Sequence, residues 1–185
     1  VRAVDHALES LGSKHSNHFC DGVAASALRL LSKALPEVQA NPSDLDARLR
    51  CQVGAWQSMV PIIGGVPMGA SHAIGHVLGG TADVPHGYCS CVMAPAVLAY
   101  NKPVNADKQA QISECFGRPG EDASKVVDEF IRGLGMPRTL SEVNVTDDQL
   151  ERIAEFTMLD FWSRTNPRPI EGPHDVMTIL NMVKG

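Results

Sequence analysis

The sequence predicts an all-α fold in a single helical domain spanning residues 1–185, on three observations. Apolar residues recur at three- and four-residue spacing along most of the chain, which is the period of an amphipathic helix. Glycine, proline and helix-capping residues separate these periodic segments. Strand-like alternation and clustered Val, Ile and Thr runs are missing, so no sheet is expected. A bundle of helices around a shared core follows.

The first half of the chain carries the clearer helix signals. Residues 1–12 place Val4, Leu8 and Leu11 on one face and end at a glycine. A second helix is expected from Asp21 to just before Pro36, since proline disrupts a helix interior. Ser43 can cap a third, which Pro61 should end. A short helix over residues 70–78 and a loop over residues 79–87 follow.

The second half predicts further helices on weaker signals. Pro95 must kink a helix over residues 89–100 or lie near its first turn. Thr146 and Gln149 have the spacing of a capping box for a helix reaching Phe161, and Pro173 precedes the last helix. The two remaining helices are expected over residues 107–116 and 121–134.

Composition excludes several functional classes. The formal net charge of −5 offers no basic surface for nucleic acid or an anionic membrane. No apolar run is long enough for a membrane span, and the first residues lack the pattern of a signal peptide. Five cysteines without CxxC pairing indicate reduced thiols in a cytoplasmic protein.

Three histidines are the strongest candidates for chemistry. His72 and His76 are four residues apart and therefore share one helix face, and His86 follows a Gly- and Pro-containing loop that can fold back toward them. Neutral imidazoles are good ligands for Fe²⁺ or Zn²⁺. Two histidines at helical spacing are often only packed, structural residues, so spacing alone makes a metal or catalytic site plausible and no more. No glutamate separates the first two, so the pattern is not that of a zinc protease.

Four separated motifs resemble the iron-containing (type III) alcohol dehydrogenases, in the order found in that family. One is the segment Gly69–Gly87, with its three histidines. The others are His6-Ala7-Leu8-Glu9, the segment Leu134–Leu140 and the turn Asn166-Pro167-Arg168-Pro169. The resemblance implies the C-terminal helical domain of this family, within the dehydroquinate synthase-like superfamily. Among its members the chain is most similar to maleylacetate reductases.

This resemblance implies a function that needs a second half. Maleylacetate reductases use NADH or NADPH to reduce maleylacetate to 3-oxoadipate in aromatic-compound degradation. Their family carries the dinucleotide on an N-terminal α/β domain, and no Gly-rich loop follows a strand here. We therefore expect an NAD(P)-dependent oxidoreductase fragment, inactive alone, that faces a small carboxylate or alcohol substrate. Its expected partners are the absent nucleotide-binding domain and a second copy in a homodimer.

The implied metal set has one departure. The resemblance assigns His6, His72 and His86 as ligands of Fe²⁺ or Zn²⁺, but the fourth ligand, normally Asp, corresponds to Arg2. A guanidinium cannot bind a divalent cation. We therefore predict that Arg2 replaces the metal electrostatically and holds a substrate carboxylate. Asp5 should not substitute, because a one-residue offset rotates it about 100° from His6.

The sequence leaves open other roles for His76 and Arg2 and other functions for the chain. The resemblance places His76 beside the nicotinamide and substrate as the proton donor, unless it is only a packed helical residue. Arg2 could instead be a solvated residue paired with Asp5 or Glu9. One alternative function is an Fe- or Zn-dependent dehydrogenase of a small primary alcohol, and another is a helical interaction module with a structural histidine cluster. The lesser candidates are expected to be surface or packing residues: His15, His18, His174, Cys89 and Cys91.

Overall fold

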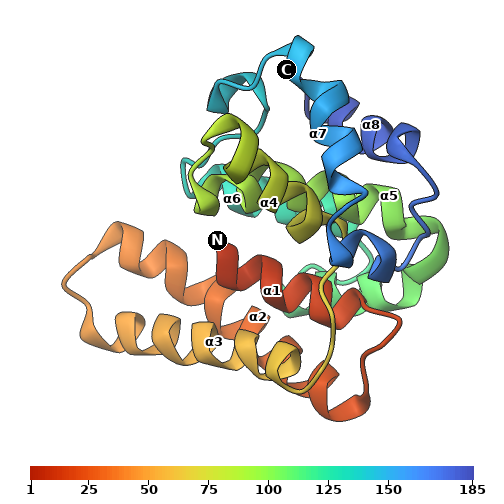
Figure 1. The fold of residues 1–185 in the computed structure, drawn as a ribbon. Helices are drawn as coiled ribbons and strands as arrows, with labels where there is room; N and C mark the ends of the chain where they lie inside the picture. Colours follow the sequence, from red (N-terminus) through yellow and green to blue (C-terminus); the bar gives the residue numbers. More distant parts are fainter.

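The computed structural model describes all 185 residues and consists of helices without a strand, which confirms the all-α prediction (Figure 1). Two groups of helices share the long helix α5. In chain order the elements are α1 (Arg2–Gly12), α2 (His18–Ala40), α3 (Leu45–Ile63), α4 (Ala70–Ala82), α5 (His86–Cys115), α6 (Ala123–Gly133), η1 (Ser141–Val143), η2 (Asp147–Gln149), α7 (Leu150–Thr157), η3 (Phe161–Thr165) and α8 (Pro173–Asn181).

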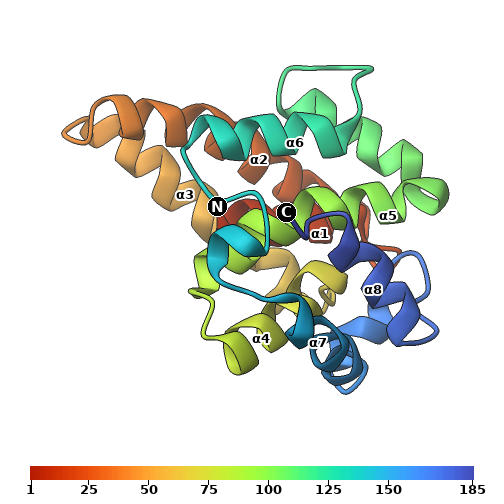
Figure 2. The ribbon, with the colours of Figure 1, turned by 90° about the horizontal axis from the view of Figure 1, so that it is seen from above.

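Helices α2 and α3 form an antiparallel hairpin that projects from the rest of the molecule (Figures 1 and 2). Asn17 caps α2 by accepting a hydrogen bond from Cys20 N, and Asp44 caps α3 through Ala47 N. The two helices approach closely at Gly54, where a Cβ atom would lie 2.8 Å from Leu31 Cγ. Glycine is therefore required for this packing distance.

Two apolar cores stabilise the fold, and α5 contributes to both. The first core joins α4, α5, α7 and α8, with Ile74 and Met93 among its fully buried side chains. The second joins α1, α2, α5 and α6, with Leu8 and Leu28 at its centre. Because opposite faces of α5 are buried in different cores, the position of α1 relative to α4 is fixed through it.

Several predicted helix ends are wrong in the first half of the chain. Helix α2 starts at His18 rather than Asp21 and continues past Pro36, and α3 includes Pro61. Asp44, rather than Ser43, is the cap of α3. A proline near a helix end removes only one or two backbone hydrogen bonds. Packing between α2 and α3 offsets that loss, and a local sequence pattern contains no information about this packing.

Helices α4 and α5 are also longer than predicted. Helix α4 extends to Ala82, so the loop before α5 shrinks to residues 83–85, and Asp83 ends α4 in the left-handed conformation. The predicted helices over residues 89–100 and 107–116 are one element, α5, kinked at Asn105, where φ is −139°. None of these helices has the length and apolar character needed to cross a membrane.

The C-terminal region differs from the prediction in one helix. The Thr146–Gln149 capping box is present, but the predicted helix to Phe161 is divided into η2, α7 and η3. Helix α8 includes Pro173 as its first residue, whereas the prediction placed this proline just before the helix.

The turn Asn166–Pro169 fastens the C-terminal region to α5. Tyr100 Oη donates to Pro169 O over 2.9 Å, and Arg168 Nη1 donates to Tyr100 O over 3.1 Å. The Arg168 guanidinium also lies 4.1 Å from the centre of the Tyr100 ring, a cation–π contact. The turn is therefore a structural clamp.

Candidate functional site

The N-terminus of α4, which carries two of the candidate histidines, is anchored from two directions. Glu9 on α1 accepts hydrogen bonds from Gly69 N at 2.9 Å and from Ser71 N at 2.8 Å. Asn166 Oδ1 accepts one from Ala70 N at 3.1 Å. These bonds satisfy backbone donors that the first turn of a helix leaves free. Helix α4 is thereby positioned against α1 and the Asn166–Pro169 turn.

Four of the predicted site residues come together in a histidine cluster, formed by His6, His72, His76 and His86. The rings of His6 and His72 are stacked with centroids 4.8 Å apart, and those of His76 and His86 lie 6.1 Å apart. The indole of Trp162 connects the two pairs, at 5.7 Å from His72 and 4.9 Å from His76. The short loop of residues 83–85 thus brings His86 back to α4, as predicted, although the glycines of the longer predicted loop lie inside α4 and α5.

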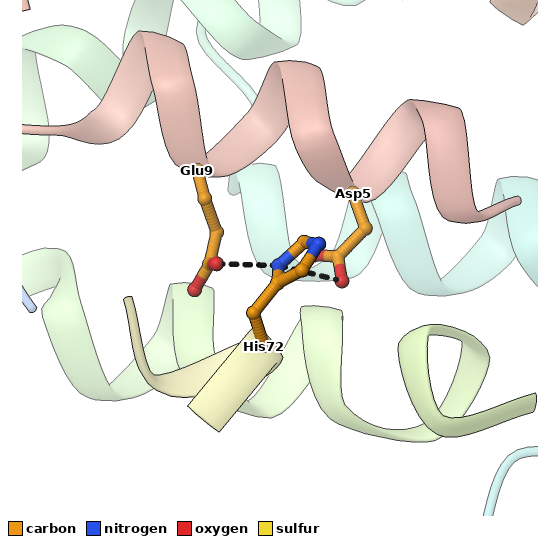
Figure 3. A group of neighbouring side chains, drawn as sticks. All are labelled: Asp5, Glu9 and His72. Carbon is orange, nitrogen blue, oxygen red and sulfur yellow. Dashed lines mark hydrogen bonds and ion pairs between the residues drawn. The ribbon is translucent and has the colours of Figure 1, made fainter. Parts of the chain in front are cut away.

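Two carboxylates on α1 point at His72 (Figure 3). His72 Nδ1 lies 2.7 Å from Glu9 Oε2 and 3.5 Å from Asp5 Oδ2. Asp5 Oδ2 also accepts a hydrogen bond from Ser71 Oγ at 2.8 Å. Asp5 is 1% exposed, so it belongs to the interior of the site.

The expectation that Asp5 points away from the site is therefore wrong. Arg2, Asp5, His6 and Glu9 follow the i, i+3, i+4, i+7 pattern, which places all four on one broad helix face. Neighbouring residues such as Asp5 and His6 are rotated by about 100° about the helix axis, and both still lie within this broad face.

The three buried groups Asp5, Glu9 and His72 shift one another's pKa values. Burial raises the pKa of Asp5, opposed by the charge of His72. Burial also acts to raise the pKa of Glu9, but hydrogen bonds from His72 and from the backbone N–H groups of Gly69 and Ser71 outweigh it and lower that pKa. For His72, burial acts to lower the pKa, and the two carboxylates reverse this and raise it. The arrangement favours a cationic His72 between two carboxylates.

Arg2 lies at the start of α1, half-buried, and it forms no ion pair within 4 Å. Its Nη1 is buried without a hydrogen-bond partner. Burial, followed by the charges of His72 and Arg2, lowers the pKa of His6 to about 3. Burial and Arg2 likewise lower the pKa of His86. The reading of Arg2 as a solvated residue paired with Asp5 or Glu9 does not describe this geometry.

The donor set does not fit a divalent cation at the position that the resemblance implies. The guanidinium of Arg2 replaces the expected carboxylate, and it would repel Fe²⁺ or Zn²⁺ beside His6. Asp5, Glu9 and His72 offer ligand atoms within 4.8 Å of one another. Hydrogen bonds from backbone N–H groups already occupy both oxygens of Glu9, and its Oε2 also contacts His72 Nδ1. Glu9 and His72 are therefore already engaged with each other, and Asp5 Oδ1 is the carboxylate oxygen of this cluster that has no hydrogen-bond partner.

Sequence reasoning missed two residues of this site, Asp160 and Trp162. Asp160 Oδ2 lies 2.8 Å from His76 Nδ1, although 84 residues separate the two in the chain. Trp162 lies between the two histidine pairs. The only available sequence signal was their proximity to the Asn166–Pro169 turn, four residues or more downstream.

The lesser candidates lie where they were expected. His15, His18 and His174 are exposed and lie away from the histidine cluster. Cys89 and Cys91 are buried, and burial raises the pKa of each thiol to about 11. A thiol with so high a pKa is a poor nucleophile at neutral pH, so these cysteines are packing residues.

Residues 1–183 match the model of the Fe-containing alcohol dehydrogenase family, C-terminal. The chain belongs to this family. Its relatives include a maleylacetate reductase of Pseudomonas sp. (strain P51), 29% identical over 180 residues, covering 97% of this chain and 49% of that protein. An NAD-dependent methanol dehydrogenase of Bacillus methanolicus is 27% identical over 90% of this chain and 46% of its own length.

Solved structures give the same result. The maleylacetate reductase of Rhizobium sp. strain MTP-10005 superposes with a TM-score of 0.88 at 29% identity, covering 99% of this chain and 50% of that one. A 1,3-propanediol oxidoreductase superposes with a TM-score of 0.88 at 29% identity, covering 98% and 49%. The chain spans about half the length of the relatives that it matches.

Proposed function

We propose that this chain is the substrate-facing half of an NAD(P)H-dependent reductase that acts as maleylacetate reductases do, converting maleylacetate to 3-oxoadipate in aromatic-compound degradation. The proposal rests on the environment of Arg2. This residue places a half-buried guanidinium, with a buried and unpaired Nη1, beside the histidine cluster. An unpaired buried donor is costly, and an anionic substrate group would satisfy it.

Two groups of the site are suited to bind a substrate carboxylate. Arg2 provides a fixed positive charge, and His72 provides a second buried nitrogen, Nε2, without a protein partner. Asp5 and Glu9 hold the opposite side of the His72 ring, so Nε2 is the nitrogen left for a ligand. Maleylacetate has two carboxylates, and a small alcohol has none. The unpaired nitrogens of Arg2 and His72 therefore favour the acid.

Reduction of a carbon–carbon double bond requires one hydride and one proton. A reduced nicotinamide, when bound, supplies the hydride to one carbon. His76 is the proton donor for the other carbon, since its ring is partly exposed and its Nε2 is not engaged by the protein. Arg2 stabilises the negative charge that develops on the substrate between the two transfers.

The site also requires a cover. The side chain of His76 is 37% exposed and His86 is exposed, so water reaches both rings. We propose that a nucleotide-binding half covers this face, binds the dinucleotide and excludes water. The exposed apolar side chains of Leu45, Trp56 and Ile63 on α3 are candidates for domain or homodimer contacts. Five free thiols are consistent with a cytoplasmic enzyme.

A metal-dependent dehydrogenase of small alcohols is the second candidate, because relatives include a methanol dehydrogenase and a 1,3-propanediol oxidoreductase. Arg2 argues against it. The deciding experiment uses the full-length protein with NADH and NADPH against maleylacetate, other 2-enoic and 4-oxo acids, and small alcohols, with and without a chelator. We expect chelator-resistant reduction of maleylacetate.

An Arg2→Lys variant should retain part of this activity, whereas Arg2→Met should raise KM strongly. Stoichiometric iron or zinc together with chelator-sensitive alcohol oxidation would reject the proposal in favour of the second candidate. Unchanged kinetics in a His76→Phe variant, with the fold intact, would instead favour a non-catalytic interaction module.

A further inference from the structure

Asp160 uses both of its carboxylate oxygens, one locally and one across the fold. Oδ1 accepts a hydrogen bond from Trp162 N at 2.9 Å and so caps η3. Oδ2 lies 2.8 Å from Nδ1 of His76 on α4. The Asp160 backbone is held as well, because Ser163 Oγ donates to its carbonyl at 2.8 Å. These two bonds hold Asp160 in place independently of its contact with His76.

The ring of His76 is restrained on its faces as well as at Nδ1. Trp162 lies 4.9 Å from it, tilted by 35°, and His86 is stacked at 6.1 Å with an interplanar angle of 16°. Together these contacts fix the plane of the ring and one of its two nitrogens. The remaining nitrogen, Nε2, makes no hydrogen bond within the protein.

We propose that Asp160 is the positioning residue of His76, holding its ring with hydrogen on Nδ1 so that Nε2 is the atom that delivers the proton to substrate. The role in catalysis rests on the proposed reductase function. An ionised carboxylate only accepts hydrogen bonds, so it requires an N–H at Nδ1. Both nitrogens carry hydrogen before transfer. When Nε2 gives its proton to the substrate carbon, the neutral ring keeps the Nδ1–H bond to Asp160.

The competing explanation is that Asp160 only caps η3. Asparagine and serine are also good helix caps, so Asp160→Asn and Asp160→Ser should preserve the bond to Trp162 N. Serine is too short to reach His76. The asparagine amide can donate to Nδ1 and so stabilise the wrong tautomer. A capping role predicts that both variants are tolerated, and a positioning role predicts that neither is.

In the full-length enzyme we expect both variants to lower kcat about 10- to 100-fold with little change in KM, by analogy with the loss caused when the carboxylate partner of a metal-ligating histidine is removed. The solvent deuterium isotope effect should increase, since proton transfer becomes slower. Asp160→Glu, which retains the carboxylate, should recover part of the rate. Asp44→Ser, which changes an equivalent cap at the start of α3, is the matched control and should leave kcat unchanged. A kcat equal to wild type in Asp160→Ser would overturn the inference.

A second measurement is independent of activity. The ¹⁵N chemical shifts of histidine-labelled protein report which ring nitrogen carries hydrogen when the ring is neutral. We expect the Nδ1–H form for His76 in the wild type and a shift toward the Nε2–H form in Asp160→Asn. Finding the Nε2–H form in the wild type would refute the positioning role. If the enzyme reduces none of the tested acids, the proposed function fails, and this measurement still decides whether Asp160 fixes His76.

Discussion

The Asn166 side chain connects three parts of the fold, and its removal should destabilise the protein strongly. Asn166 is 1% exposed. Its Oδ1 accepts from Ala70 N and from Asn101 Nδ2, each at 3.1 Å, and its Nδ2 donates to Asn101 Oδ1 and to Arg168 O, each at 2.7 Å. The Asn166→Ala variant loses all of these bonds.

The expected loss of stability follows from the partners that remain buried. The N–H of Ala70 and the Nδ2 of Asn101 are both left without their partner, and the two residues are 0% and 5% exposed. Each buried unsatisfied group costs about 1–3 kcal/mol. The total is about 2–6 kcal/mol, a large part of the 5–15 kcal/mol that is typical of a folded domain.

Urea unfolding of the 185-residue chain measures this difference. Circular dichroism at 222 nm reports the helices, and tryptophan fluorescence in a Trp56→Phe background, where Trp162 is the only tryptophan, reports the packing near the turn. The matched control is Asn181→Ala, an exposed asparagine at the end of α8, which should change the free energy of unfolding by no more than about 0.5 kcal/mol. Asn166→Ala should also reduce activity of the full-length enzyme, because Ala70 begins the helix that carries His72 and His76.

The reasoning would be refuted if Asn166→Ala unfolded within about 0.5 kcal/mol of the wild type with an unchanged dependence on urea. That result would mean that water replaces the lost partners, so the turn would not be a clamp.

Three further predictions concern packing, pH and metal binding. Gly54→Ala should destabilise the chain by about 1–2 kcal/mol, since overpacking against Leu31 exceeds the gain in helix propensity. The control Gly22→Ala, whose new Cβ would have nothing within 4 Å, should stabilise the chain by about 0.5–1 kcal/mol in the same urea assay. His6 has a lowered pKa, so it stabilises the fold above pH 6.5 and this contribution is lost as pH falls toward about 3. The His6→Phe variant cannot titrate, so the free energy of unfolding should depend less steeply on pH in this window, by at most about 1.4 kcal/mol per pH unit. An unchanged slope would mean that other groups cause the pH dependence. Arg2→Asp should create Fe²⁺ or Zn²⁺ binding that the wild type lacks, measured by calorimetry with the metal alone. Equal binding by both proteins would contradict the electrostatic argument.

The local features of the fold and the site were predictable from sequence. Helical periodicity predicted an all-α protein, and the four-residue spacing of His72 and His76 placed them on one face. The same spacing placed Arg2 beside His6. Each of these inferences depends on residues within one or two turns of a single helix, whose geometry is nearly constant.

Helix ends and merged helices were decided by tertiary packing. Pro36 and Pro61 lie inside helices because contacts between α2 and α3 outweigh the lost backbone hydrogen bonds. Residues 101–106 join two predicted helices into α5, whose faces are buried in two cores. Local propensity carries no information about such contacts.

The sequence by itself determined which residue types the site contains, and the tertiary structure determined which of them meet. Glu9 and His72 are 63 residues apart, and His76 and Asp160 are 84 apart. No spacing rule relates residues on separate helices, because their distance depends on how side chains in both cores pack. Helix periodicity is enough to place Asp5 on the face of α1 that carries Arg2 and His6, but only the packing of α4 against α1 places His72 and Ser71 opposite it.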